Sequence, residues 1–202
     1  MKGSIFALIL FLGLNGCQEN LSSPPNILWI TVEDISPNLG CYGDPLAHTP
    51  TLDSLASKGF LYNNAIANAP VCAPARNAII TGMYPSSLGT LHMRSFSSSL
   101  KSRGRIPKEV KLYPEILRNA GYYCTNNSKE DYNFDLKREI WDESSKTAHW
   151  KNRPDKDTPF FSVFNLILTH ESCINDKEKH ERLTQELPQH LRTDPAKIVV
   201  PP

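Results

Sequence analysis

Two long apolar runs constrain the fold of this chain more than any other feature of its sequence. The first covers residues 26–32 and the second covers residues 159–168. Such runs are typical of buried strands in a parallel sheet. Between them, residues 49–59, 74–82 and 113–121 have helix signals, with proline near the start and glycine at the end. The alternation of strands and helices predicts an α/β fold with a largely parallel central sheet.

Polar side chains follow the predicted strands at the point where each strand ends. Glu33 and Asp34 follow the first run, His170 follows the second, and Lys129 lies in a polar loop after a shorter predicted strand at residues 122–125. Each residue has an ordinary explanation alone, since solvated acids, surface lysines and structural histidines are common. Together they predict one pocket, because open α/β sheets bind ligands at the carboxyl ends of their strands. The two carboxylates suit a hard divalent cation such as Ca²⁺ or Mg²⁺.

Cys72 lies at the start of a predicted helix, where its position favours nucleophilic chemistry. Backbone N–H groups are unpaired at a helix N-terminus and the helix dipole is positive there, so anions and nucleophiles are stabilised. Arg76 follows about one helical turn later, and its planar fork suits tetrahedral oxyanions. A buried structural cysteine before an ordinary helix is the simpler alternative for an isolated cysteine. The acids, Lys129 and His170 favour the catalytic interpretation.

The beginning of the chain predicts export. A lysine near the start is followed by an apolar run from residue 5 to residue 14, which is too short to span a membrane and has the pattern of a signal peptide. Residues 14–17, Leu-Asn-Gly-Cys, resemble the bacterial lipobox, whose cysteine is lipidated. We predict a lipoprotein-type signal peptide at residues 1–16, lipidation of Cys17 and a polar tether at residues 17–25. The lipidated protein would lie in the bacterial cell envelope, periplasmic or at the outer-membrane surface. A plain secretory signal cut nearby is the alternative.

Composition is that of one globular domain, which we place at residues 26–202. The chain has 202 residues, a formal net charge of +1 and 40% hydrophobic residues. This charge does not argue for a nucleic-acid partner. Export permits disulfides, but the pairing of Cys41, Cys124 and Cys173 does not follow from the sequence. No Cys-x-x-Cys pair or Cys/His cluster indicates a zinc site.

Several segments of the chain resemble the formylglycine-dependent sulfatases. Residues 26–34, 40–43 and 49–56 are similar to the opening of that family. Residues 70–76, Pro-Val-Cys-Ala-Pro-Ala-Arg, match its Cys-x-Pro-x-Arg signature, and residues 81–85 continue the match. The resemblance implies an alkaline-phosphatase-like sulfatase fold.

Three further segments resemble one bacterial branch of that family, the heparan N-sulfatase-like or sulfamidase-like proteins. They are residues 89–95, 125–129 and 141–145. This resemblance implies a sulfated polysaccharide or glycosaminoglycan as the substrate.

The family resemblance implies that the nucleophile is made from Cys72. A formylglycine-generating enzyme would oxidise this cysteine to formylglycine, whose hydrate carries two hydroxyls. One hydroxyl would attack the sulfur of a sulfate ester or sulfamate and expel the alcohol or amine. The covalent sulfate would then be eliminated as the aldehyde reforms.

The remaining family residues fall on the polar groups already singled out. The resemblance assigns Ca²⁺ or Mg²⁺ to Glu33, Asp34 and Cys72. It implies that Arg76 holds the formylglycine hydrate, and that Lys129 and His170 contact the sulfate or the leaving group.

Three departures from the family pattern accompany this match. Glu33 is a glutamate where the family has an aspartate, and Asp131 stands where a second histidine is common. His92 is a tentative substrate-binding replacement for that histidine. The chain ends at Pro202, before the Asp-Asn or Asp-His pair that a later strand supplies to the metal. We therefore expect it to be the N-terminal part of a catalytic domain whose C-terminal part is missing.

Three functions remain open on the sequence. The first is an exported sulfatase that acts on sulfated glycans. The second is a truncated, inactive sulfatase remnant or surface binding module. The third is a phosphoester or phosphonate hydrolase of the same superfamily, because related enzymes share the nucleophile signature.

Overall fold

Four parallel strands form the central sheet in the part of the chain that the structure describes. The computed structural model describes residues 23–93, 106–192, 194 and 196. The strands are β1 (Ile27–Val32), β2 (Tyr123–Asn127), β3 (Glu143–Ser144) and β4 (Phe160–Leu166), and their order in the sheet is β1-β4-β2-β3. All three strand pairs are parallel. The predicted α/β fold with a parallel sheet is therefore confirmed.

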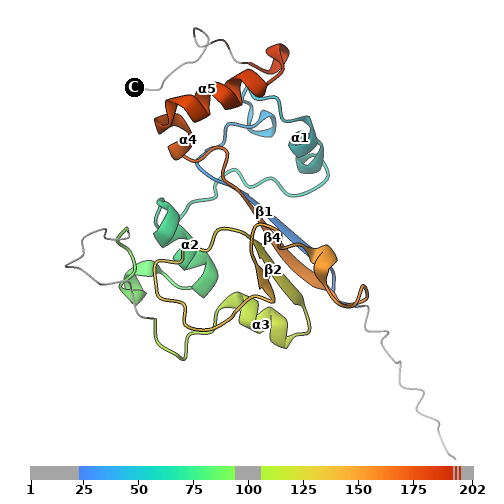
Figure 1. Ribbon diagram of the computed structural model, residues 1–202, viewed down its shortest axis with the longest axis vertical. Helices are drawn as coiled ribbons and strands as arrows, with labels where there is room; N and C mark the ends of the chain where they lie inside the picture. The colour runs from blue at the N-terminus through green and yellow to red at the C-terminus, as the bar shows by residue number, and fades with distance from the viewer. Residues whose placement is uncertain (1–22, 94–105, 193, 195, 197–202) are drawn as a thin grey trace, which may run out of the picture.

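The helices lie in two groups relative to this sheet (Figure 1). Helices α2 (Cys72–Thr81) and α3 (Tyr113–Asn119) lie beside the strands. Helices α1 (Pro50–Ala56), α4 (Ser172–Asn175) and α5 (Lys177–Glu186) lie at the other end of the molecule, beyond β1 and β4. Short 3₁₀ turns occur at Gly40–Tyr42, Pro85–Leu88, Trp150–Asn152 and Gln189–Leu191. None of the helices in the described ranges is long and apolar enough to cross a membrane.

The hydrophobic core fills the space between the sheet and helices α2 and α3. Successive strand residues point to opposite faces, and Phe161 and Val163 of β4 are buried in the core. The ring of Trp29 on β1 packs against Tyr113 on α3 and against Phe161. The core residues buried most completely are Ile80, Leu112, Cys124 and Ile140. This core fixes α2 against the sheet and therefore fixes the start of α2, where Cys72 lies.

The burial of β1 differs from the prediction. We expected a buried strand, but Leu28 is 49% exposed and Ile30 is 52% exposed. Both residues alternate with Trp29, which faces the core, so they point to the opposite face of the sheet. In the described part of the chain, β1 also stands at the edge of the sheet, with β4 as its neighbour. The apolar run thus predicted the strand correctly, but the prediction that both faces of the strand are buried was wrong.

The loop after β1 is held by one aspartate. Asp53 on α1 accepts hydrogen bonds from the Cys41 backbone N–H (2.7 Å) and from the Thr49 hydroxyl (3.0 Å). The Thr49 hydroxyl in turn accepts from the Gly40 N–H at 2.9 Å. A Cβ at position 40 would lie 2.5 Å from Asp53 Oδ2. A side chain at position 40 would therefore push the Asp53 carboxylate out of this network.

We expect Gly40→Ala to lower the free energy of unfolding by about 1–3 kcal/mol, because the added methyl must displace the Asp53 carboxylate from its hydrogen bonds. Urea denaturation of the purified chain measures this change. Gly59→Ala is the matched control, since its Cβ would have Leu55 O at 3.5 Å as its nearest neighbour, an ordinary contact. Equal losses in the two variants would contradict the steric explanation.

Candidate active site

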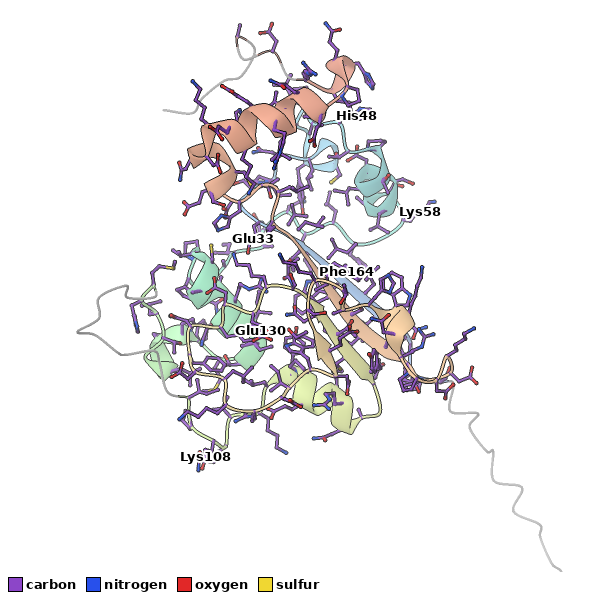
Figure 2. The ribbon with its side chains drawn as sticks, viewed as in Figure 1. Glu33, His48, Lys58, Lys108, Glu130 and Phe164 are labelled. Carbon is purple, nitrogen blue, oxygen red and sulfur yellow. The ribbon has the colours of Figure 1, made fainter. Side chains whose placement is uncertain are left out.

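Three strand ends and one helix start meet at the candidate site. Because β1, β2 and β4 are parallel, their carboxyl ends lie at one edge of the sheet. Glu33 directly follows β1, Lys129 follows β2, and His170 follows β4. Cys72 is the first residue of α2. Figure 2 shows Glu33 at the junction between the part that contains the sheet and the part that contains α4 and α5.

Cys72 lies at the N-terminus of α2 as the sequence predicts. Val71 before it is extended, and Gly82 ends the helix in the left-handed conformation with φ 66°. The Cys72 Sγ lies 3.8 Å from His170 Nε2. This helix start places the sulfur beside backbone N–H groups that have no partner within the helix.

His170 directs one ring nitrogen toward this sulfur. The backbone N–H of Ser172 donates to His170 Nδ1 at 3.2 Å. In the neutral ring Nδ1 is then the acceptor, and the proton lies on Nε2. That nitrogen lies 3.8 Å from Glu33 Oε2 as well as beside Cys72. His170 therefore presents an N–H donor to the site.

Glu33 is a carboxylate surrounded by cationic side chains. Its Oε2 lies 2.7 Å from Lys129 Nζ, and its Oε1 lies 3.9 Å from Arg76 Nη1. The Glu33 side chain is only 9% exposed. A charge removed from water to this extent needs partners, and Lys129 and Arg76 supply them. Asp131 adds a second carboxylate 3.9 Å from Lys129 Nζ.

Arg76 is held from one side by three acceptors. Its Nε donates to the Glu130 carbonyl at 2.9 Å. Its Nη2 donates to the Lys129 carbonyl and, at 2.9 Å, to Asn165 Oδ1. The remaining nitrogen, Nη1, faces Glu33. The guanidinium is therefore oriented by the scaffold, with one edge toward the site.

The described cysteines other than Cys72 lie outside this cluster. All four described cysteines, Cys72 included, are free thiols, so no disulfide forms among them. Burial, with a smaller contribution from the nearby Asp142 carboxylate, raises the pKa of the Cys124 thiol to about 12. Cys124 therefore stays protonated and unreactive at neutral pH. Cys72 is the cysteine that the fold combines with a histidine, a lysine and an arginine.

The two predicted carboxylates are oxygen donors at the end of β1. Asp34 adopts φ 54°, and its Oδ2 accepts the Glu171 N–H at 3.1 Å. Within the described ranges, no group of three or more His, Cys, Asp and Glu residues is arranged to hold a metal ion. Glu33 and Asp34 are oxygen donors of the kind that Ca²⁺ and Mg²⁺ prefer, but Ca²⁺ takes about six to eight such ligands. The two residues fit part of a metal site.

The structure leaves two predicted residues outside this geometry. His92 is exposed, and its backbone carbonyl accepts a hydrogen bond from Asn133 Nδ2, so its substrate-binding role stays a prediction. Cys17 and the predicted signal peptide lie outside the described residues.

Asn165 is part of the site but is absent from the predicted residues. It lies near the end of β4, a central strand of the sheet, and its Oδ1 accepts a hydrogen bond from Arg76. A polar side chain within the apolar run at residues 159–168 is the signal that could have pointed to it.

A sulfatase family profile matches residues 25–196. The chain belongs to the sulfatase family. An ulvan-active sulfatase from Formosa agariphila is 48% identical over 168 residues, which are 80% of this chain and 28% of that protein. The N-acetylgalactosamine-6-sulfatase of Rattus norvegicus is 29% identical over 87% of this chain and 34% of its own length. The chain thus spans about a third or less of these curated relatives.

Solved structures support the same fold. A protein in complex with its substrate D-glucosamine-2-N,6-O-disulfate aligns with a TM-score of 0.58 over 73% of this chain and 35% of its own. A 2-O GAG sulfatase aligns with a TM-score of 0.57 over 74% of this chain and 36% of its own. Both are 21% identical in sequence. The chain corresponds to the N-terminal part of this alkaline-phosphatase-like sulfatase fold.

The family membership does not identify the substrate. The two curated relatives are named for ulvan and for N-acetylgalactosamine 6-sulfate, not for heparan N-sulfate. The predicted heparan N-sulfatase-like branch therefore stays a prediction.

Proposed function

We propose that this chain supplies the nucleophile half of a sulfatase that hydrolyses sulfate esters or sulfamates of sulfated glycans. The observation that carries the proposal is the position of Cys72, at the N-terminus of α2 and 3.8 Å from His170 Nε2. Membership of the sulfatase family supports the same reaction class. Because the chain spans 28% of the ulvan-active sulfatase, the activity of the whole protein belongs to the proposal.

The nucleophile in this proposal is formylglycine, made from Cys72 by a formylglycine-generating enzyme. Its hydrate supplies a hydroxyl that attacks sulfur. The residues of the chain then have distinct roles. Arg76 Nη1 and Lys129 Nζ stabilise negative charge on the sulfate oxygens. His170 donates the Nε2 proton to the leaving oxygen or nitrogen.

Glu33 keeps these cations in place before substrate binds. Its two oxygens lie near Lys129 and Arg76, so it reduces the repulsion between these two cations. Its Oε2 also lies 3.8 Å from His170 Nε2. In the proposal Glu33, Asp34 and the group made from Cys72 also hold part of the coordination shell of Ca²⁺ or Mg²⁺. A metal held there would supply Lewis-acid stabilisation of the sulfate oxygens.

Location and partners are further parts of the proposal. We propose export, with a lipid anchor on Cys17 if the lipobox is used. A sulfated polysaccharide or glycosaminoglycan outside the cytoplasm is the matching substrate. The name of the ulvan-active relative supports a sulfated glycan.

Anion selectivity tests the proposal. The 202-residue chain and any longer product of the same gene are co-expressed with a formylglycine-generating enzyme. Sulfate release from 4-nitrophenyl sulfate and from sulfated polysaccharides is compared with phosphate release from 4-nitrophenyl phosphate. We expect release from sulfate esters that falls when a chelator removes Ca²⁺ or Mg²⁺ and returns when the metal is added.

Two outcomes would contradict this expectation. Preferential release of phosphate would favour a phosphoester hydrolase. An absence of release from every form of the protein would favour the inactive remnant or binding module.

A further inference from the structure

We infer that Asn165 is a positioning residue that orients Arg76 for catalysis. This inference rests on the proposed function, in which Arg76 stabilises charge on the sulfate. Asn165 lies on β4, one residue before the strand ends, and is 9% exposed. It is a buried amide in contact with a site residue.

The amide of Asn165 uses its full hydrogen-bonding capacity. Its Oδ1 accepts from Arg76 Nη2 and from the Thr31 hydroxyl, both at 2.9 Å. Its Nδ2 donates to Asn126 Oδ1 at 2.9 Å and to the Asn127 carbonyl at 3.2 Å. An asparagine amide offers two donors and two acceptor lone pairs. Because the partners of Nδ2 are both acceptors, the amide has one orientation, with Oδ1 toward Arg76.

Asn165 connects Arg76 to the rigid part of the fold. Its other partners come from β1 and β2, so three strands fix the position of its oxygen. The two other acceptors of Arg76 are the carbonyls of Lys129 and Glu130, which lie in the loop after β2. The strand-borne acceptor is therefore the one whose position does not depend on that loop.

The side chain of Arg76 is not fully packed on one side. A cavity of about 30 Å³ adjoins it, and its lining includes Thr31, Asn126, Asn165 and Tyr113 as well as Arg76. Side chains next to an empty space are not fixed by van der Waals contact on that side. Hydrogen bonds must then orient the guanidinium. Loss of the Asn165 acceptor would remove one of the bonds that direct Nη1 toward Glu33.

Two variants separate positioning of Arg76 from general support of the sheet. Asn165→Asp keeps an oxygen acceptor for Arg76 and Thr31 but loses both donors to β2. Asn165→Leu loses the acceptor and the donors. Ser162→Ala is the matched control, because Ser162 is fully buried on the same strand and its hydroxyl bonds Thr125 at 2.6 Å.

The first readout is hydrogen exchange of the Arg76 guanidinium protons by NMR, with the signal assigned from its loss in Arg76→Lys. In Asn165→Leu we expect exchange to be faster by about tenfold, the effect of one lost hydrogen bond. In Asn165→Asp and Ser162→Ala we expect exchange close to wild type, although both variants unfold at lower urea concentrations. Activity is not needed for this measurement.

The second readout is the kinetics of sulfate ester hydrolysis. We expect kcat to fall by about 10- to 100-fold in Asn165→Leu, because misplacement of a catalytic group costs this much. The fall in Asn165→Asp should be several times smaller.

Two results would overturn the inference. One is slow exchange of Arg76 in a folded Asn165→Leu protein that loses only stability, as the control does. The other is fast exchange in a folded Asn165→Asp protein, which decides the matter even if Asn165→Leu does not fold. If the wild type releases no sulfate while Asn165→Leu mobilises Arg76, the proposed function fails and the link between Asn165 and Arg76 stands.

Discussion

Cys72→Ala is expected to lower sulfate release by about 10⁴-fold or more, because removal of a covalent nucleophile leaves only binding and electrostatic stabilisation. Oxidation of Cys72 to formylglycine replaces its CH₂–SH group by an aldehyde and lowers the mass of the protein. The Cys72→Ala variant should not show this decrease in mass. Intact-protein and peptide mass spectrometry measure the modification, and released sulfate measures turnover. The two readouts address the same side chain, since Cys72 is the residue placed beside His170.

Cys41→Ser is the control for this experiment. Cys41 is half-buried in the 3₁₀ turn after β1 and is also a free thiol. We expect this variant to keep both the modification and the activity. An unmodified Cys72 in an active wild-type protein would contradict the proposed nucleophile, and so would full activity in Cys72→Ala.

Arg76→Lys is expected to lower kcat by about 100-fold, because a catalytic charge displaced by about 1 Å costs this much. Lysine keeps the positive charge but has a single nitrogen. It cannot donate to the Lys129, Glu130 and Asn165 oxygens and also direct an N–H toward Glu33. The substitution therefore tests the direction of the cation more than its charge. Steady-state kinetics on a sulfate ester give kcat and KM separately.

Arg118→Lys is the matched control for the arginine substitution. Arg118 lies on α3, its side chain is 35% exposed, and its Nε bonds Asp142 at 2.9 Å. Surface ion pairs contribute about 0–1 kcal/mol, so we expect little change in kcat or stability. A loss of activity in Arg118→Lys as large as that in Arg76→Lys would show that the effect is not local to the site.

Local sequence patterns predicted the elements of the site well. The apolar run at residues 26–32 predicted β1, and the acids after it were correctly placed at the end of a strand. Pro74 and Gly82 predicted a helix with Cys72 at its entrance, and α2 begins at Cys72 itself. These predictions succeed because strand periodicity, proline at a helix start and glycine at a helix end act over a few residues.

Local patterns were less successful at the ends of β2 and on the faces of β1. Asn126 and Asn127 were predicted in a polar loop, but they extend β2. Their side chains form hydrogen bonds with distant segments of the same polypeptide. Asn126 Oδ1 accepts from Asn165 Nδ2, and Asn127 Nδ2 donates to the Lys146 carbonyl. Polar residues with tertiary partners can therefore occupy a strand that local propensity alone would end earlier.

The sequence by itself determined the family, the parallel α/β fold and the position of Cys72 at the start of a helix. Only the tertiary structure decided which side chains surround that residue. Cys72 and His170 are 98 residues apart in the chain, and Glu33 and Lys129 are 96 apart. Their contacts depend on the strand order, in which β4 lies between β1 and β2. No local pattern encodes that order, because it follows from the packing of the whole core. The same packing places Asn165 behind Arg76 and completes the surroundings of Cys72.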